Sequence, residues 1–524
     1  MSLPRLAGRG AGFGVFAAGF VLCVAFLHPV LAQPPVGDTT SGLFPSAIVL
    51  AGNGFDLADL LARPGWSEGG PNVHPFSLPT WLTALALYAI SDDLSLLRFL
   101  HFVHFAIAAC VLLGTFRLAC EVVTPGLALA LTGSLLLFPL FRVQAGYLYT
   151  EMPLAACTVW AVLCAARRRW RGALVWSALA CFTKEAGVVV PVALALAAAL
   201  EPLAARQRFV RVAAFAAPPL CVAFLQLVVA LPAEAANAYR PPYGIYAVDV
   251  FRKLALVPDL AALLAAFMLA GLWGGRAAWR ALREGGAAPG EAAVGPRVLA
   301  LSLLGVTCFV GFYALVPLTG AEVYLLPRYY VQIAPLVLLS LVAVGQRVAG
   351  RRLAFALLGL LAAFFVLNRS GAFYPPVPGN EFSLAERSFE YRELLSAQRR
   401  LVDAAAALPA DLPVFYGLPE HFLFSYARMG YARAPLGLGH CVWLEERYRR
   451  GRLADYPERF AILYDFAGYG GNVFQSLVRQ ARADPTRRVR SRVFAEGRYR
   501  TVLFLVSTVA AEPGESSAPR KVQP

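Results

Sequence analysis

Lysine is rare in this chain, and one lysine lies where a charge is costly. Of Lys184, Lys253 and Lys521, only Lys184 stands between two apolar runs, in the segment Cys-Phe-Thr-Lys-Glu-Ala-Gly. A cation in apolar surroundings is expensive in a membrane protein and is therefore a functional candidate. The chemistry that suits it is anion binding, and the phosphate of a membrane-anchored lipid is an anion that would meet it there.

Arginines on both sides of Lys184 fix its expected depth. Arginine clusters mark cytoplasmic loops, so both ends of the intervening stretch 170–202 are expected inside. Two full spans would need roughly 20 residues each, so this stretch can form only a short hairpin with Lys184 at its recessed tip. The flanking arginines are Arg167, Arg168, Arg169, Arg171, Arg206, Arg208 and Arg211.

Three other charged residues are expected on the same outer face as Lys184. Asp38 follows the first apolar run, Glu151 opens a later one, and Arg328 precedes another. An acidic residue can accept a proton from an attacking hydroxyl at neutral pH, and fixed cations can neutralise a leaving phosphate. Four separate loops are therefore predicted to converge on one external site.

Each of these residues also has a purely structural interpretation. Asp38 could cap a helix that begins near residue 41, and Glu151 could be stabilised by the helix dipole. Lys184 could form an ion pair with its neighbour Glu185. Arg328 could anchor the membrane interface beside Tyr329. The functional and structural interpretations both stay open at the level of the sequence.

The composition is that of a polytopic membrane protein. Hydrophobic residues make up 58% of the 524 residues, charged residues 15%, and the mean hydropathy is +0.60. The net charge of +15 does not indicate a nucleic-acid-binding protein, because the arginines recur between apolar segments rather than forming one patch with interleaved aromatics. The cysteine spacing predicts neither a disulfide framework nor a zinc site.

The arginine pattern predicts about eleven membrane spans and an external C-terminus. Residues 33–95 form a long first external loop, in which residues 41–62 and 81–90 are expected as helices on the membrane surface. The first run resembles a signal peptide and is interpreted as an uncleaved helix. The expected spans are 11–32, 97–116, 127–140, 153–166, the two arms of 170–202, 212–231, 254–273, 298–315, 330–344 and 353–367.

The composition changes after the last predicted span. Residues 1–369 are assigned to the transmembrane domain, residues 370–510 to a small extracytoplasmic α/β domain, and residues 511–524 to a disordered tail. Residues 386–408 have helical periodicity, and a second helix is expected after Asn472. Strands are expected at 413–416, 461–464 and 501–507.

A second polar group lies near the start of the predicted span 97–116. His101 and His104 share a helical face, and Arg98 and the pair Asp92-Asp93 are close in sequence. No complete ligand set of strong spacing is present, so a structural or substrate-contact role is favoured over a metal site. No cofactor is required by the sequence, and a divalent metal stays open.

Several short motifs follow one another in a fixed order along the chain: Gly37-Asp38-Thr39, His74-Pro75 with Leu78-Pro79, Thr150-Glu151-Met152-Pro153-Leu154, Phe182-Thr183-Lys184-Glu185 and Pro327-Arg328-Tyr329-Tyr330. With these motifs in this order, the chain resembles the GT-C superfamily of glycosyltransferases. The branches it looks closest to are bacterial relatives of protein O-mannosyltransferases and of the lipid A aminoarabinose transferase. The resemblance in layout covers residues 11–367.

The resemblance implies a sugar donor on a polyprenyl phosphate and transfer at the periplasmic face of a bacterial inner membrane. Asp38 would be the catalytic acidic residue, and Glu151 the second one. Lys184, Arg328, His74 and Arg98 are assigned to the donor-binding side. The chain departs from the family pattern at Thr39, where members often have a second acidic residue, and at Glu151, where many have Asp.

The expected function is therefore transfer of a sugar, with inversion, to an acceptor hydroxyl of a lipid, glycan or protein. The alternative is a multi-pass transporter of lipid-linked or cell-envelope substrates. The lack of internal repeats and the gathering of charges at one face weigh against transport. A non-catalytic scaffold is a third alternative, but it leaves Asp38, Glu151 and Lys184 without a shared purpose.

Overall fold

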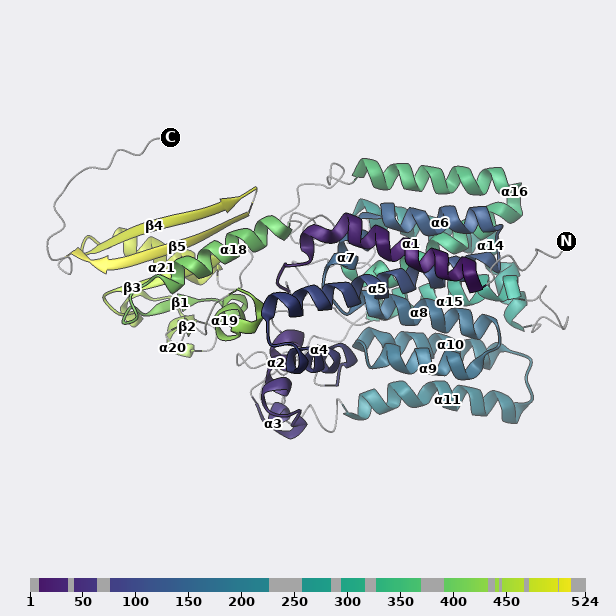
Figure 1. The fold of residues 1–524 in the computed structure, drawn as a ribbon, viewed down its shortest axis with the longest axis horizontal. Coiled ribbons are helices and arrows are strands. Elements are labelled where there is room, and N and C mark those ends of the chain that lie inside the picture. The colour runs from purple at the N-terminus through teal and green to yellow at the C-terminus, as the bar shows by residue number, and fades with distance from the viewer. Residues whose placement is uncertain are drawn as a thin grey trace.

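The computed structural model describes residues 9–35, 42–63, 76–225, 257–283, 294–315, 327–368, 391–431, 439–442, 445–465, 471–497 and 499–509. Asp38 and His74, which the sequence analysis assigns to the site, lie outside the described residues. A bundle of helices carries a small sheet domain at one end (Figure 1). This mostly helical fold, with several apolar helices and a C-terminal sheet, is the fold class expected from the sequence.

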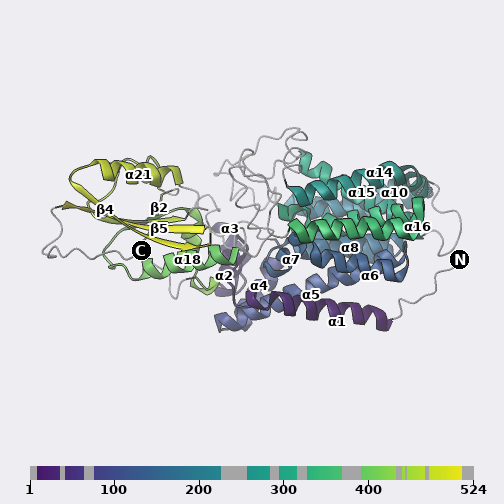
Figure 2. The ribbon, with the colours of Figure 1, turned by 90° about the horizontal axis from the view of Figure 1, so that it is seen from above.

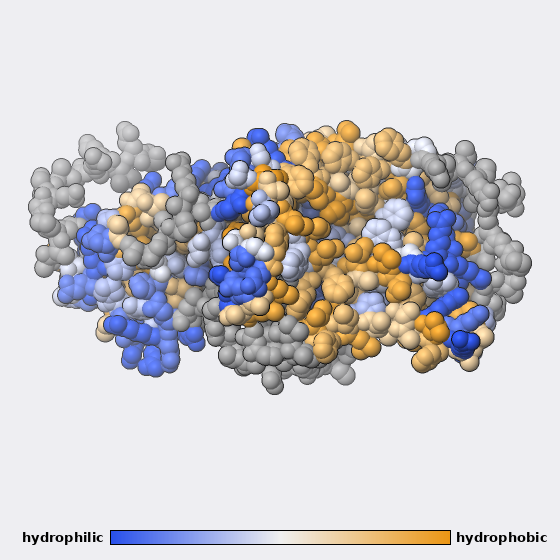
Figure 3. All heavy atoms as spheres, turned by 60° about the horizontal axis from the view of Figure 1, so that its bottom comes forward, coloured by the Kyte–Doolittle hydropathy of each residue, from blue (hydrophilic) through white to orange (hydrophobic). Residues whose placement is uncertain are grey.

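The bundle helices run roughly parallel or antiparallel to one another (Figures 1 and 2). The face of the bundle seen in Figure 3 carries a broad apolar band between two more polar ends. Large apolar side chains of the bundle helices are exposed, such as Leu272 at 75% and Phe13 at 72%. A surface of this kind needs an apolar solvent, which a lipid bilayer provides. The bundle helices are α1 (Arg9–Leu27), α5 (Asp93–Cys120), α6 (Pro125–Leu137), α7 (Pro139–Gly146), α8 (Glu151–Ala166), α9 (Trp170–Cys181), α10 (Val189–Leu200), α11 (Ala205–Phe224), α14 (Pro258–Arg283), α15 (Val294–Leu315) and α16 (Ala334–Leu367).

Five helices in the described part of the chain are long and apolar enough to cross a membrane. The pair α6 and α7 would be a sixth span, bent by 68°. Shorter apolar helices cover Leu78–Ala89, Glu151–Ala166 and Glu185–Leu200. The total of about eleven spans stays a prediction. The five long helices are Gly10–Val30, Asp93–Cys120, Pro258–Arg283, Val294–Ala314 and Arg328–Leu367.

Helix α16 folds back on itself. The backbone leaves helical geometry at Ala349 and at Gly350, whose φ of 80° is in the left-handed region that favours glycine. A Cβ on Gly345 would lie 3.6 Å from the Cα of Ala354. Nine residues of straight helix would separate these positions by about 13 Å. The final pair of helices around Arg347, Arg351 and Arg352 therefore forms a hairpin, as the sequence predicts.

The segment around Lys184 is also a hairpin. Helix α9 ends at Cys181, and the short 3-10 helix η4 (Glu185–Val188) leads into α10. Gly187 packs so closely on the last turn of α9 that a Cβ there would lie 1.8 Å from the carbonyl oxygen of Ala180. The Gly187 amide donates to the Lys184 carbonyl at 2.8 Å. Glycine is therefore required where the turn holds Lys184.

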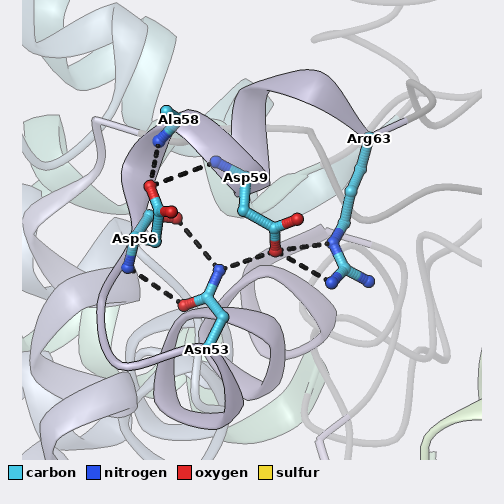
Figure 4. A network of polar contacts seen from close by, with 5 residues as sticks. All are labelled: Asn53, Asp56, Ala58, Asp59 and Arg63. Carbon is cyan, nitrogen blue, oxygen red and sulfur yellow. Dashed lines mark hydrogen bonds and ion pairs between the residues drawn. The ribbon is translucent and has the colours of Figure 1, made fainter.

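Three short helices follow α1 before the bundle continues: α2 (Phe44–Gly52), α3 (Leu57–Ala62) and α4 (Leu78–Ala89). A polar network joins α2 to α3 (Figure 4). Asp56 caps α3 by accepting from the amides of Ala58 and Asp59, at 2.8 and 3.2 Å. Asn53 donates to Asp59 at 2.8 Å, and Arg63 donates to the same carboxylate at 2.9 Å. Placement of these helices on the membrane surface stays a prediction.

The C-terminal sheet has five strands in the order β2-β1-β3-β5-β4. β1 pairs in parallel with β2 and β3, and β5 pairs antiparallel with β3 and β4. Helices α18 (Tyr391–Ala406) and α21 (Gly471–Ala483) both pack on the sheet, and the short helices α19 (Leu418–Ser425) and α20 (Glu446–Arg449) lie in its connections. The strands are β1 (Val414–Tyr416), β2 (Gly439–Cys441), β3 (Phe460–Asp465), β4 (Arg487–Glu496) and β5 (Tyr499–Thr508).

Three strands and both packing helices lie where the sequence predicts them. The sequence pattern does not predict β2, which is three residues long, or β4. β4 is an edge strand with four arginines, Arg487, Arg488, Arg490 and Arg492, and most of its residues are exposed. Charges on an edge strand discourage pairing with another chain, and they also hide the apolar alternation that reveals a strand.

We predict that Gly187→Ala destabilises the protein by about 1–3 kcal/mol, because the added methyl must push η4 away from α9. Thermal unfolding in detergent measures this loss. Gly359→Ala in α16 is the matched control, since a Cβ there meets nothing within 4 Å. Equal melting temperatures for the two variants would contradict the packing described for the Lys184 turn.

Candidate functional site

The structure brings together three of the predicted site residues in an ion cluster. The Lys184 ammonium donates to Oε1 of Glu151 at 2.5 Å. Nε of Arg328 lies 3.3 Å from the same oxygen. The side chains of Glu151, Arg328 and Lys184 are 2%, 3% and 15% exposed. These contacts hold two cations against one buried carboxylate.

Aromatic rings surround the two cations. The Lys184 ammonium lies 4.2 Å from the ring centroid of Tyr329. The Arg328 guanidinium lies 4.7 Å from the Tyr149 ring and 5.0 Å from the Tyr329 ring. Ring faces attract cations electrostatically, and more strongly where water is excluded. The rings therefore hold both cations in place without neutralising their charge.

Three segments far apart in the sequence position the cluster. Glu151 is the first residue of α8, Lys184 precedes η4, and Arg328 belongs to the 3-10 helix η7 (Pro327–Ile333). Residues 147–150 lead into α8 in a non-helical stretch. Tyr147 and Tyr149 lie two residues apart in this stretch, and their rings are in contact, with centroids 5.0 Å apart. η7 packs against both α7 and α8, so Arg328 reaches Glu151.

These contacts bear on alternatives that the sequence leaves open. Lys184 forms an ion pair with Glu151, which is 33 residues away in the sequence. Arg328 is buried against Glu151 rather than exposed as an interface anchor. The convergence of separate loops is therefore observed for Glu151, Lys184 and Arg328. The role of each in chemistry stays a prediction.

The other predicted site residues lie elsewhere or outside the description. Arg98 is exposed near the start of α5 and is not among the residues of the ion cluster. Asp38 and His74 are not described, and their assignments stay predictions. His101 and His104 are buried and contact backbone carbonyls, those of Gln33 at 3.1 Å and Gln144 at 3.2 Å. These contacts favour the structural role for the two histidines.

The described residues around Glu151 do not fit a divalent metal. No group of three or more His, Cys, Asp or Glu gathers anywhere in the described parts of the chain. Glu151 is the only acidic member of the described ion cluster, and two cations already face its carboxylate. A divalent ion at this oxygen would meet like charges on two sides, which is electrostatically unfavourable.

A second buried carboxylate lies at the other end of α10. Glu201, the C-cap of α10, contacts Arg297 and lies 3.0 Å from Arg211. Both arginines also stack on Trp170, at 5.0 and 4.3 Å. This second cluster lies among the cytoplasmic arginines predicted from the sequence.

The tyrosines at positions 147, 149 and 391 are not among the site residues predicted from the sequence. Tyr147 and Tyr149 had a local signal, because they precede Glu151 at a spacing of two in Gly-Tyr-Leu-Tyr-Thr-Glu. Tyr391 has none, since it comes from the C-terminal domain and reaches the site only through the tertiary fold.

We predict that Glu151→Gln lowers stability by about 3–5 kcal/mol, because it leaves two cations without their buried carboxylate. If the cluster binds the lipid phosphate that the sequence motifs lead us to expect, an added lipid phosphate should then stabilise the variant more than the wild type, since the phosphate would replace the missing counter-ion. Thermal unfolding with and without undecaprenyl phosphate measures both effects.

Glu201→Gln is the matched control, because the same residue type is buried between two arginines at the other end of α10. It should also lose stability, but undecaprenyl phosphate should give it no extra stabilisation. Equal rescue of both variants would mean that the lipid acts on the bundle as a whole rather than on Lys184 and Arg328.

Comparison with known proteins gives matches at the level of structure. No family model and no curated protein matches the chain. It is similar to ArnT from Cupriavidus metallidurans bound to undecaprenyl phosphate, with 14% identity and a TM-score of 0.42 over 97% of this chain and 100% of that chain. The same protein in the apo state gives 15% identity and a TM-score of 0.45 over 93% and 98%.

The chain is also similar to the apo oligosaccharyltransferase from Archaeoglobus fulgidus. The identity is 11% and the TM-score 0.42, over 88% of this chain and 70% of that chain. Similarities with TM-scores below 0.5 do not assign an activity to this chain. Its function is therefore inferred from the ion cluster, its surroundings and the sequence motifs.

Proposed function

We propose that the protein is a membrane glycosyltransferase that moves a sugar from a polyprenyl-phosphate donor to an acceptor hydroxyl. The observation that carries this proposal is the ion cluster, in which Lys184 and Arg328 both contact the buried carboxylate of Glu151. Two cations held next to each other at one place can together bind an anion such as a phosphate. The sequence motifs that contain these residues suggest that the anion is the donor phosphate.

The two cations have complementary properties for binding a phosphate. Lys184 supplies a compact point charge, and Arg328 supplies a planar guanidinium that can donate two parallel hydrogen bonds. In the absence of donor, Glu151 keeps both from lying uncompensated in an apolar bundle, where an isolated charge is very costly. When the donor binds, its phosphate would also compensate the two positive charges. Glu151 would remain the counter-ion that keeps the two cations in position.

An apolar groove beside the ion cluster suits the tail of such a donor. It lies between α14, α15, η7 and α16. Tyr330 lines it two residues after Arg328, so one short helix faces both the ions and the groove. A phosphate on an isoprenoid chain matches this pairing. The lining residues are Leu260, Leu263, Leu264, Phe267, Val306, Val310, Tyr330, Ile333 and Val337.

The proposed step is a direct displacement at the anomeric carbon of the donor. The acceptor oxygen forms the new bond to that carbon while the bond to the phosphate oxygen breaks, which inverts the anomeric configuration. The acceptor proton goes to the carboxylate of Asp38, and the electron pair leaves with the phosphate. Lys184 and Arg328 stabilise the charge that builds on the leaving phosphate, which needs no general acid because it is a weak base.

The cluster's position supports transfer at the outer face. Lys184 precedes α10, and the Glu201 cluster with its arginines lies at the end of α10. Arginine-rich ends of membrane helices face the cytoplasm. The ion cluster would then open to the periplasmic side of the inner membrane, where the C-terminal domain would also lie. His74 and Arg98 remain proposed donor contacts.

We predict that purified wild-type protein in nanodiscs releases undecaprenyl phosphate from at least one of a panel of undecaprenyl-phosphate sugars. Lys184→Ala, Arg328→Ala and Asp38→Asn should each reduce the rate by about 10² or more, the scale of lost electrostatic or acid-base catalysis. Chromatography of the released lipid phosphate gives the rates.

Arg208→Ala is the control for loss of a positive charge, because Arg208 is exposed and donates only to the Leu203 carbonyl at 3.2 Å among its described bonds. It should keep the wild-type rate. Turnover that survives all three site substitutions would show that the chemistry is elsewhere. Movement of an intact donor across the membrane without release of lipid phosphate would support the transporter instead.

A further inference from the structure

A tyrosine of the C-terminal domain reaches the bundle. Tyr391 is the first residue of α18, and it is 2% exposed although it begins a helix of the sheet domain. Its ring lies 4.2 Å, centroid to centroid, from the ring of Tyr147. A Cβ on Gly146 would lie 3.7 Å from the Tyr391 hydroxyl oxygen. Tyr391 is therefore inserted against the segment that leads into Glu151.

The contact continues ring by ring to the ion cluster. Tyr147 lies 5.0 Å from Tyr149, and Tyr149 lies 4.7 Å from the guanidinium of Arg328. All three tyrosines are less than 7% exposed. Close-packed rings transmit a displacement because they leave little free volume. If Tyr391 were withdrawn, Tyr147 and then Tyr149 would gain room to turn, and Arg328 would lose one of the two rings that hold it.

Other contacts fix the C-terminal domain on the bundle and so fix Tyr391. Arg428 donates to the Leu87 carbonyl at 2.8 Å and the Ile90 carbonyl at 2.6 Å, and pairs with Asp93 at 3.0 Å. The Tyr431 hydroxyl donates to the Pro35 carbonyl at 2.7 Å. These contacts reach the end of α4, the start of α5 and the residues after α1. The domain is thus held at several points around the same end of the bundle (Figure 1).

We propose that Tyr391 is a positioning residue, through which the C-terminal domain sets the orientation of Arg328 for binding the donor phosphate. This inference rests on the proposed function, because it assigns Arg328 a phosphate to bind. The contact described for Tyr391 is with Tyr147, and through Tyr147 and Tyr149 it acts on Arg328. The C-terminal domain is in this way a structural part of the phosphate site, rather than only a platform for an acceptor.

A role in core packing alone makes a different prediction. Loss of packing at Tyr391 would lower stability but would leave the preference for a phosphate unchanged, because that preference depends on the orientation of charged groups. The preference is the ratio of two dissociation constants in nanodiscs, for undecaprenol and for undecaprenyl phosphate. The two lipids share the same tail, so the ratio isolates binding of the phosphate.

We predict that Tyr391→Met, which fills the site without a ring, reduces the phosphate preference by about tenfold, the scale of one weakened charge-assisted contact. Tyr391→Phe keeps the ring and should restore the wild-type preference. Phe474→Met is the matched control, because Phe474 is 3% exposed in α21 and packs in a different cluster of the same domain. It should leave the preference unchanged.

A double-mutant cycle tests the route through Arg328. In an Arg328→Ala background, Tyr391→Met should reduce the preference no further, because the group that it positions is gone. An additive effect would overturn the inference, as would a wild-type preference in Tyr391→Met itself. If Tyr391→Met does not fold, Tyr147→Met can replace it in the double-mutant cycle, because it removes the next ring of the same stack.

Failure of the proposed function has a separate signature. A wild-type protein that binds undecaprenol and undecaprenyl phosphate equally has no phosphate site, and both proposals then fall. A wild-type protein that prefers the phosphate while Tyr391→Met keeps that preference retains its function, and only the positioning role is wrong.

Discussion

The rest of the structure depends on one shared carboxylate, that of Glu151, which two cations contact in a nearly water-free place. Removal of ionised groups from water is costly, and their attraction offsets this cost only if the geometry is held closely. Here the start of α8, the turn before η4 and the 3-10 helix η7 must lie close together, so that Lys184 and Arg328 both reach the Glu151 carboxylate. The close packing of Gly187 on α9 and of η7 on α8 is the means by which the bundle meets that requirement.

Glu151 and Glu201 are both buried between two cations, but their surroundings differ. Glu201 also lies between two cations, but both are arginines that stack on a single tryptophan at the arginine-rich end. The Glu151 cluster instead combines a lysine with an arginine and borders an apolar groove through η7. Burial of an ion pair by itself is therefore not a sign of function. The neighbouring groove and the motif residues make the first cluster a candidate site.

The sequence predicted the site's charged members but not the way they are held. Lys184, Glu151 and Arg328 could be found because charges are rare in apolar segments, and the arginine pattern placed them on one face. The ion pair between Glu151 and Lys184 could not be predicted, because the two residues are 33 positions apart and the sequence gives the neighbouring Glu185 as an equally good partner for Lys184. Tyr391 gave no signal, since its contact exists only after the C-terminal domain docks. β4 was hidden by arginines that face solvent at a sheet edge.

The length of α10 has a consequence for the lipid around the protein. With η4, the 3-10 helix before it, α10 joins Lys184 to Glu201 by 16 residues, which span about 26 Å. The hydrocarbon layer of a bilayer is about 30 Å thick. If the Glu201 end lies at the inner boundary, as proposed above, Lys184 would lie about 4 Å beneath the outer one. A lipid phosphate would then have to move only a short way below the headgroup plane, and a thicker bilayer would lengthen that path.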